Sequence, residues 1–202
     1  MNGDDVMDFI KVGAACPKTN VSDVKYNIEN IFTCIDDASS KGVKFLVFPE
    51  LCVTSYTCAD LFLTSSWLSS SIEGLKEIVD KTKDVDMVVV VGAPLLFNNI
   101  LYNCGYVIFN GKILGIVPKS FLPNYSEFYE KRWFTEGANI IDDTVDLPFQ
   151  ENIPFGVNLL FCTGDIKFGV EVCEDLWVTI PPSSYLTLLR ENILGNLSAS
   201  NE

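Results

Sequence analysis

Three strand-length apolar runs in this chain each end in a chemically reactive side chain. The runs are FLVFPE at residues 45–50, ILGIVPK at 113–119 and IKFGVEVC at 166–173, and they end in Glu50, Lys119 and Cys173. Uninterrupted apolar runs of this length are typical of strands that are buried on both faces, as in α/β proteins. Because such proteins build their sites at the carboxyl ends of strands, we expect these three side chains to meet at one rim of a sheet.

The chain contains no histidine, which restricts the chemistry that Cys173 can perform. A thiolate must then be formed by a carboxylate or an amine, so Cys–His and Ser–His–Asp mechanisms are excluded. The seven cysteines form no C-x-x-C pair and no histidine can complete a zinc site, so no metal site is expected. Most of the cysteines lie in apolar runs, which indicates core side chains in a reducing compartment.

Length and composition indicate one globular domain, or one domain and a fragment of another. The chain has 202 residues, of which 48% are hydrophobic and 20% are charged. It has neither an apolar run long enough to cross a bilayer nor the features of a signal peptide, so we expect a cytoplasmic protein without a membrane partner. The formal net charge of −13 argues against binding to nucleic acid, because phosphate contacts need clustered Lys and Arg.

Hydrophobic periodicity predicts alternating strands and helices. Helical spacing of apolar residues over 23–39 follows a cap at Ser22 or Asp23, and 61–83 is an irregular helical region. Asn110 and Gly111 favour a type I′ hairpin turn. The predicted strands cover 9–16, 43–48, 87–92, 102–109, 112–117, 159–163, 166–172 and 193–197, with a last helix over 181–189. This order predicts α/β layering with a mixed sheet.

Three segments resemble the signature segments of the nitrilase (carbon–nitrogen hydrolase) superfamily. They are FPEL at 48–51, PKSFLP at 118–123 and EVCEDLW at 171–177. Further segments are similar to the glutaminase domain of glutamine-dependent NAD synthetases: ELCVTSYTCADLF at 50–62, LPNYSEFYEKRWF at 122–134, PPSS at 181–184 and NLSAS at 196–200. The resemblance runs in the same order from about residue 9 to the end of the chain.

The resemblance implies an α-β-β-α sandwich, which becomes four-layered where superfamily-type dimerisation brings two such units together. Because the family domain continues with further strands and a helix, we expect residues 1–202 to be a partial carbon–nitrogen hydrolase domain, incomplete at the C-terminus. No synthetase domain is expected in the chain. Such a fragment is expected to be weakly active or inactive alone.

The resemblance also implies catalytic roles. Cys173 would attack the side-chain amide of glutamine, giving a thioester and releasing ammonia. Glu50 would act as general base, and Lys119 would stabilise the oxyanion together with a backbone N–H just after the nucleophile. A second carboxylate would orient Lys119 and Glu50. We place it at Glu130, with Glu127 as the alternative that spacing leaves open.

Five further residues match the substrate pocket of this branch. Tyr125, Glu174 and Ser200 match positions that hold the amino-acid group of glutamine, and Tyr56 and Phe128 match residues that line the pocket. For Phe128, ordinary packing is an equally good interpretation. The resemblance implies no cofactor for the glutaminase step. ATP, Mg and deamido-NAD would belong to the absent synthetase domain.

The expected function is therefore hydrolysis of glutamine to glutamate and ammonia, as the ammonia-supplying part of NAD synthesis. The expected partners are glutamine, a second copy of the chain in a homo-oligomer, and a synthetase domain in the full-length enzyme. Two alternatives remain at this point. One is a stand-alone nitrilase-type amidase acting on another small amide, and the other is a non-catalytic interaction fragment.

Overall fold

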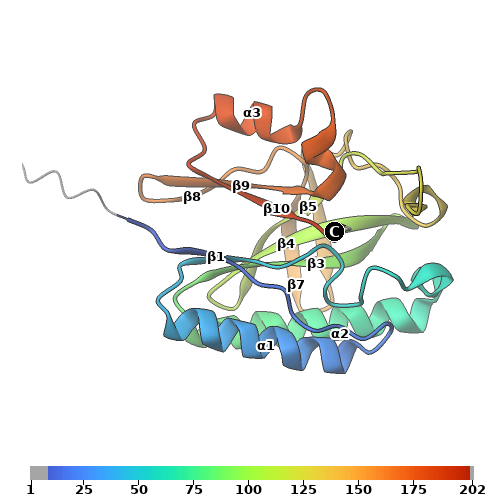
Figure 1. Ribbon diagram of the computed structural model, residues 1–202, viewed down its shortest axis with the longest axis horizontal. Helices are drawn as coiled ribbons and strands as arrows, with labels where there is room; N and C mark the ends of the chain where they lie inside the picture. Colours follow the sequence, from blue (N-terminus) through green and yellow to red (C-terminus); the bar gives the residue numbers. More distant parts are fainter. Residues whose placement is uncertain (1–8, 201–202) are drawn as a thin grey trace, which may run out of the picture.

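A computed structural model describes residues 9–200, in which two β-sheets pack face to face between layers of helices (Figure 1). The large sheet has the strand order β1 (Val12–Ala14), β2 (Phe45–Val47), β3 (Val88–Phe97), β4 (Ile100–Phe109), β5 (Lys112–Pro118), β7 (Gln150–Phe155) and β6 (Asp143–Leu147). The small sheet has the order β10 (Ile193–Leu197), β9 (Ile166–Val172) and β8 (Phe161–Thr163).

Helices cover the outer face of each sheet. Helices α1 (Val24–Ser40) and α2 (Ser65–Lys81) lie against the large sheet, and the short helix α3 (Pro182–Leu188) lies against the small sheet (Figure 1). The α-β-β-α sandwich implied by the sequence is therefore confirmed. The irregular region expected around the second helix consists of a 3₁₀ turn at Ala59–Leu63, then α2, then a second 3₁₀ turn at Thr82–Asp84.

Strand β3 explains why the apolar runs are uninterrupted. Val89 and Val91 belong to the cluster that α1 and α2 cover, whereas Val90 faces the small sheet and joins the cluster between the two sheets. All three side chains are fully buried. Because successive side chains of a strand point to opposite faces, a strand between two covered faces needs apolar residues at every position.

Two local features follow the sequence closely. Of the two possible caps of α1, Asp23 takes the position, and its carboxylate accepts a hydrogen bond from the Tyr26 N–H at 3.1 Å. The predicted hairpin turn between β4 and β5 has positive φ angles of 47° at Asn110 and 72° at Gly111, as a type I′ turn requires.

The three site-bearing strands lie in two sheets, which corrects the expectation of a single rim. Strands β2 and β5 belong to the large sheet. They run in the same direction, because β2 pairs parallel with β3, β3 pairs antiparallel with β4, and β4 pairs antiparallel with β5. Strand β9 belongs to the small sheet. The site is therefore assembled between the facing sheets, where the carboxyl end of β9 meets those of β2 and β5.

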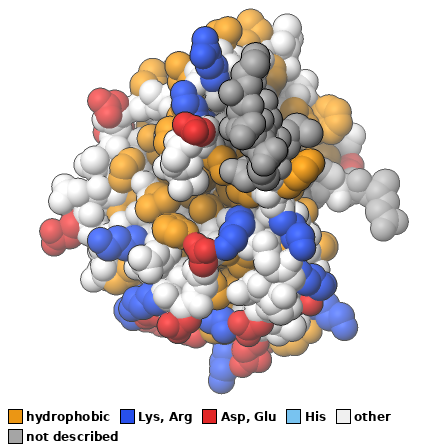
Figure 2. Space-filling view, turned by 90° about the vertical axis from the view of Figure 1, so that its left-hand side faces the viewer, with side chains coloured by type: hydrophobic (Ala, Val, Ile, Leu, Met, Phe, Trp, Pro, Cys, Tyr) orange, Lys and Arg blue, Asp and Glu red, His pale blue; other side chains and the backbone are white. Residues whose placement is uncertain are grey.

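Charged side chains of both signs gather over the layer formed by α1 and α2, at the bottom of the face in Figure 2. Ion pairs at the surface join Lys41 to Asp37 and the half-buried Lys81 to Asp36 on this layer. Such exposed pairs contribute little to stability and mainly keep the surface hydrated. Among residues 9–200, no helix has both the length and the apolar character that crossing a bilayer requires.

Candidate active site

A close approach between two backbones positions Glu50. Strand β2 ends at Val47, and the following turn crosses β3 directly above Gly92. A Cβ atom at Gly92 would lie 2.5 Å from the Glu50 Cα and 2.3 Å from the Leu51 nitrogen, so only glycine fits beneath this turn. The turn is also held by the Val53 N–H, which donates to the Gly92 carbonyl at 3.2 Å.

Lys119 is the first residue after β5, and its side chain joins two carboxylates in the interior. Its Nζ lies 2.8 Å from Glu50 Oε2 and 2.6 Å from Glu130 Oε1. The three side chains are almost completely buried. Burial alone would lower the pKa of Lys119, but the charges of Glu50 and Glu130 outweigh it and raise this pKa. Lys119 is therefore held as a cation.

Cys173 sits at a strained turn where β9 ends. Val172 is the last residue of the strand, and Cys173 opens a 3₁₀ turn with a φ angle of 47°, which is unusual for a residue other than glycine. The thiol lies close enough to Glu50 and Ser198 for both side chains to act on it. Burial, and then the charge of Glu50, raises the pKa of the Cys173 thiol to about 11. The resting thiol is therefore neutral.

Asp175 ties the strand end that carries Cys173 to the one that carries Lys119. Its buried carboxylate accepts hydrogen bonds from the backbone N–H groups of Val172 at 3.1 Å, Ser120 at 3.2 Å and Phe121 at 2.9 Å. Burial raises the pKa of Asp175 to about 7, although the backbone N–H groups favour its ionised form. In the sequence this residue appeared only as part of the EVCEDLW segment.

The structure distinguishes the two possible second carboxylates. Glu130 is buried against Lys119, whereas Glu127 is exposed. The pKa of Glu130 is raised by burial and then by the charge of Glu50. Lys119 and Tyr56 act in the opposite direction, because they stabilise the ionised carboxylate. The Tyr56 hydroxyl donates to Glu130 Oε1 at 2.8 Å.

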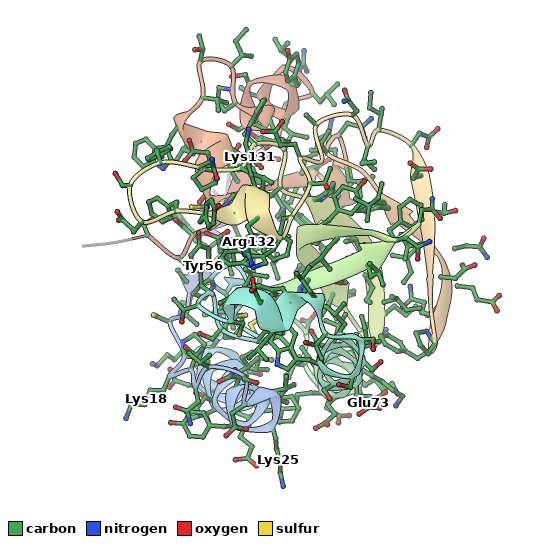
Figure 3. All side chains as sticks on the ribbon, turned by 90° about the vertical axis from the view of Figure 1, so that its right-hand side faces the viewer. Lys18, Lys25, Tyr56, Glu73, Lys131 and Arg132 are labelled. Atoms are coloured by element: carbon green, nitrogen blue, oxygen red, sulfur yellow. The ribbon has the colours of Figure 1, made fainter. Side chains whose placement is uncertain are left out.

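The loop that carries Tyr56 is tied to the turn that carries Glu130. Arg132 donates to both carboxylate oxygens of Asp60 at 2.7 and 2.8 Å, and the Trp133 indole N–H donates to the same carboxylate at 2.8 Å. Figure 3 shows Tyr56 beside the turn that carries Lys131 and Arg132. These contacts hold the two loops together at the edge of the site.

The remaining predicted residues extend outward from this buried centre. The Tyr125 hydroxyl donates to Glu174 Oε2 at 2.8 Å, and Tyr125 is 54% exposed. The Phe128 ring lies between those of Tyr125 and Tyr56, at centroid distances of 5.8 and 6.4 Å. Ser200 forms a hydrogen bond with the Ser198 hydroxyl.

Apart from the alternative Glu127, the residues that the sequence singled out are thus connected by direct contacts or by one intermediate side chain. Asn103, Asp175, Ser198 and the backbone N–H of Ala199 also belong to the site, although the sequence did not single them out. The Ala199 N–H donates to Glu50 Oε1 at 3.2 Å. Position 199 lies in the NLSAS segment at the end of β10. The resemblance of this segment to the family was the sequence feature that indicated that the end of β10 reaches the site.

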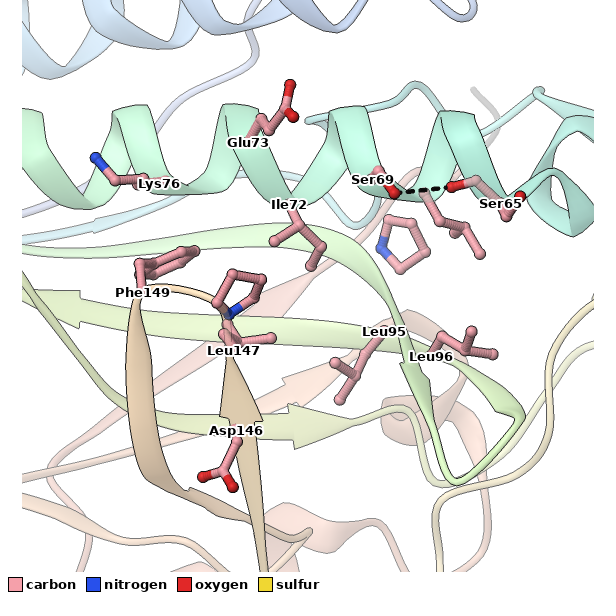
Figure 4. Close-up of a pocket in the computed structure, with 13 residues that line it drawn as sticks. Ser65, Ser69, Ile72, Glu73, Lys76, Leu95, Leu96, Asp146, Leu147 and Phe149 are labelled. Carbon is pink, nitrogen blue, oxygen red and sulfur yellow. Dashed lines mark hydrogen bonds between the residues drawn. The ribbon is translucent and has the colours of Figure 1, made fainter.

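The hollows in the described part of the chain lie away from these residues, and two of them have apolar linings. One of about 580 Å³ lies between α2 and the β6–β7 turn, with an apolar floor that includes Leu95, Leu147 and Phe149 (Figure 4). The other, of about 430 Å³, opens at the amino ends of β2 and β9, where Phe45 and Phe168 line it. Within residues 9–200, no group of three or more Cys, Asp or Glu side chains is arranged to hold a metal ion.

Comparison with known proteins identifies the family. The family model described as carbon-nitrogen hydrolase matches residues 11–194, which is most of the chain. The chain belongs to the carbon–nitrogen hydrolase family. It is therefore a hydrolase by family, and the superfamily resemblance seen in its motifs is confirmed.

Its relatives also support the similarity to one branch of the family. The chain is 35% identical over 195 residues to the glutamine-dependent NAD(+) synthetase of Mycobacterium tuberculosis strain H37Rv, covering 95% of this chain and 28% of that protein. A solved glutamine-dependent NAD(+) synthetase from Cytophaga hutchinsonii superposes with a TM-score of 0.83 at 33% identity, covering 95% of this chain and 30% of that one. The carbon–nitrogen hydrolase described here thus spans less than a third of these relatives.

A more distant structure supports the fold alone. The Nesterenkonia AN1 amidase from the nitrilase superfamily superposes with a TM-score of 0.66 at 16% identity, covering 91% of this chain and 64% of the amidase. The two chains therefore share the nitrilase fold.

Proposed function

We propose that this carbon–nitrogen hydrolase converts glutamine to glutamate and ammonia through a covalent thioester on Cys173. The single observation that carries the proposal is the buried cluster of Glu50, Lys119 and Glu130, against which the neutral thiol of Cys173 is held. The similarity to glutamine-dependent NAD(+) synthetases supports glutamine as the substrate and the supply of ammonia for NAD synthesis as the role.

In the first half-reaction, Cys173 Sγ attacks the side-chain carbonyl carbon of glutamine. Glu50 takes the thiol proton during the attack, since a neutral thiol must lose its proton to become a nucleophile. The Lys119 ammonium group and the backbone N–H of Glu174 stabilise the negative charge that develops on the amide oxygen. Glu50 then gives its proton to the leaving nitrogen, the C–N bond breaks, and ammonia departs to leave a thioester.

In the second half-reaction, Glu50 removes a proton from a water molecule that attacks the thioester carbon. The C–S bond breaks, the proton returns to Cys173, and glutamate is released. Glu130 acts on Lys119 throughout, because a second buried carboxylate keeps this ammonium group charged. No cofactor enters either step.

The outer residues hold the amino-acid group of glutamine. Glu174, held by the Tyr125 hydroxyl that donates to it, offers a carboxylate to the substrate ammonium group, and the Ser200 hydroxyl offers a donor to the substrate carboxylate. Tyr56 and Phe128 line the path of the aliphatic part. Tyr125 and Glu174 lie at the solvent-exposed end of the contacts that lead outward from Glu130. The polar amino-acid group of glutamine would lie at this mouth of the site.

A substrate panel tests the proposal. Glutamine, asparagine and short aliphatic amides are supplied in turn, ammonia is measured, and Cys173→Ala serves as the inactive control. Preference for glutamine is expected. Faster turnover of the aliphatic amides would favour the alternative amidase function, and no turnover of any amide would favour a non-catalytic interaction fragment.

We also propose that the chain forms a homo-oligomer in the cytoplasm and works with a synthetase domain, which would bind ATP, Mg and deamido-NAD. Large apolar side chains are exposed on α3 and the turn before it, including Trp177, Ile180, Tyr185 and Leu188. Exposed apolar groups of this density favour association. Mass measurement of the purified chain tests this proposal, and a monomer at micromolar concentration contradicts it.

A further inference from the structure

Asn103 is buried in the centre of the site. It contacts the backbone of Lys119 and also the two carboxylates that bind the Lys119 side chain. It lies on β4, one residue before Cys104, whose pair with Pro118 ends the β4–β5 ladder. The Asn103 carbonyl accepts a hydrogen bond from the Lys119 N–H at 2.8 Å. Its side chain is completely buried. The side-chain amide N–H₂ group donates to Glu50 Oε2 at 2.7 Å and lies 3.5 Å from Glu130 Oε2.

The donors around Glu50 are distributed unevenly over its two oxygens. Oε2 accepts from Lys119 at 2.8 Å and from Asn103 at 2.7 Å. Oε1 accepts from the Ala199 N–H, at the longer distance of 3.2 Å. Each donor stabilises negative charge on the oxygen that it contacts and makes that oxygen less basic. Oε1 is therefore the more basic oxygen of Glu50.

The orientation of the Asn103 amide is determined by these carboxylates. Its Oδ1 is buried and has no hydrogen-bond partner among residues 9–200. Turning the amide over would place Oδ1 against Glu50 Oε2, where two acceptors repel each other. An unpaired buried acceptor is unfavourable, so the donor contacts to the two carboxylates are what hold the amide in this orientation.

We propose that Asn103 is a positioning residue that holds Glu50 by Oε2 and so directs proton transfer with Cys173 to Oε1. The inference rests on the proposed function of Glu50 as the general base. Asn103 and Lys119 are the residues, among those described, whose side chains contact both carboxylates. Lys119 supplies a positive charge to the two carboxylates, and Asn103 directs proton transfer to one oxygen of Glu50.

The test compares Asn103→Leu and Asn103→Ala with a matched control. Leucine has a similar size but no donor, and alanine also lacks a donor and is small enough to avoid a steric clash if the larger variant fails to fold. Ser71→Ala is the control, because Ser71 on α2 is equally buried and its hydroxyl also lacks a partner among the described residues. Two readouts are needed, namely the pH dependence of kcat/KM for glutamine and a carbon NMR titration of the Glu50 carboxyl group.

Loss of the Asn103 donor removes a contact that favours the ionised carboxylate, so both readouts are expected to move to higher pH. On the acidic side of the profile kcat/KM is expected to fall about tenfold, and it recovers toward the unmodified value at higher pH. Ser71→Ala leaves both readouts unchanged. A fall in kcat/KM that is equal at all pH values, with an unmoved titration, would mean that Asn103 is only structural.

The NMR readout keeps this inference separate from the proposed function. The Glu50 signal is assigned by its loss in Glu50→Gln, and its titration requires no turnover. If the unmodified chain hydrolyses no amide, the proposed function fails, and the titration still decides whether Asn103 acts on Glu50. If the chain is active and the titration is the same with and without Asn103, the inference about Asn103 alone is overturned.

Discussion

Glu50 and Lys119 are 69 residues apart in the sequence, yet their side chains meet at 2.8 Å where neither is exposed to solvent. Burying an ion pair is costly unless further hydrogen bonds satisfy both partners. Here Glu130, Asn103 and Ala199 provide those contacts. This arrangement is unfavourable for stability alone and is well suited to a site that needs a fixed charge beside a reactive thiol.

Replacement of either partner is expected to reduce turnover strongly. Glu50→Gln removes the general base and Lys119→Ala removes the oxyanion donor, so each lowers kcat by about 100-fold or more. Steady-state assays of ammonia release measure this loss. Retention of near-normal kcat in either variant would remove that residue from the role proposed here.

Glu130 and Glu127 make a matched pair of substitutions. Glu130→Gln weakens the hold on the Lys119 ammonium group, so kcat is expected to fall at least tenfold. Glu127→Gln changes an exposed side chain and should leave kcat within about twofold. The reverse pattern in the same assay would assign the second carboxylate to Glu127.

The raised pKa of Cys173, about 11, predicts an unusual pH dependence of alkylation. The thiolate is the reactive form, and at pH 7 it makes up only about one part in 10⁴ of this residue. The rate of modification by iodoacetamide should therefore be very low at neutral pH and rise about tenfold per pH unit up to pH 10. Peptide mapping at each pH measures the rate at Cys173, and a plateau near pH 7 would contradict a neutral resting thiol.

Gly92 is expected to be necessary for the position of Glu50. A methyl group in Gly92→Ala would press against the backbone of Glu50 and Leu51, so we expect a loss of about 1–3 kcal/mol in the free energy of unfolding, together with lower turnover. In the same sheet, Gly13→Ala meets only the side chains of Leu46 and Val43 at 3.2 Å or more. Denaturant unfolding of both variants measures the difference. Equal small losses would mean that the turn above β3 adjusts freely.

The parts of the fold that the sequence predicted are those set by local patterns. The apolar run of β3, the Asn110–Gly111 turn and the cap at Asp23 each depend on neighbouring residues. The sequence did not predict the β3–β4 turn at Asn98 and Asn99, both with positive φ, because Asn–Asn is a weaker turn signal than Asn–Gly. It also missed β6 and β7, in which polar residues outnumber the buried ones.

Within the site, the motifs predicted side chains that the structure brings together, and tertiary structure supplied what supports them. The role of Asp175 depends on β9 ending beside β5, and that of Asn103 depends on the register between β4 and β5. Neither relationship is encoded in spacing along the chain. For the same reason, the site forms between two sheets, although the sequence suggested one rim.

The most direct test of the account is covalent trapping with a glutamine-like chloroketone, followed by intact-mass measurement and peptide mapping. The chain has seven cysteines, of which Cys16 and Cys162 are exposed and Cys173 is buried at the site. A single adduct on Cys173 is expected, with loss of labelling in Cys173→Ala and in the presence of excess glutamine. Labelling mainly at Cys16 or Cys162, unaffected by glutamine, would contradict the assignment of Cys173 as the nucleophile of a glutamine site.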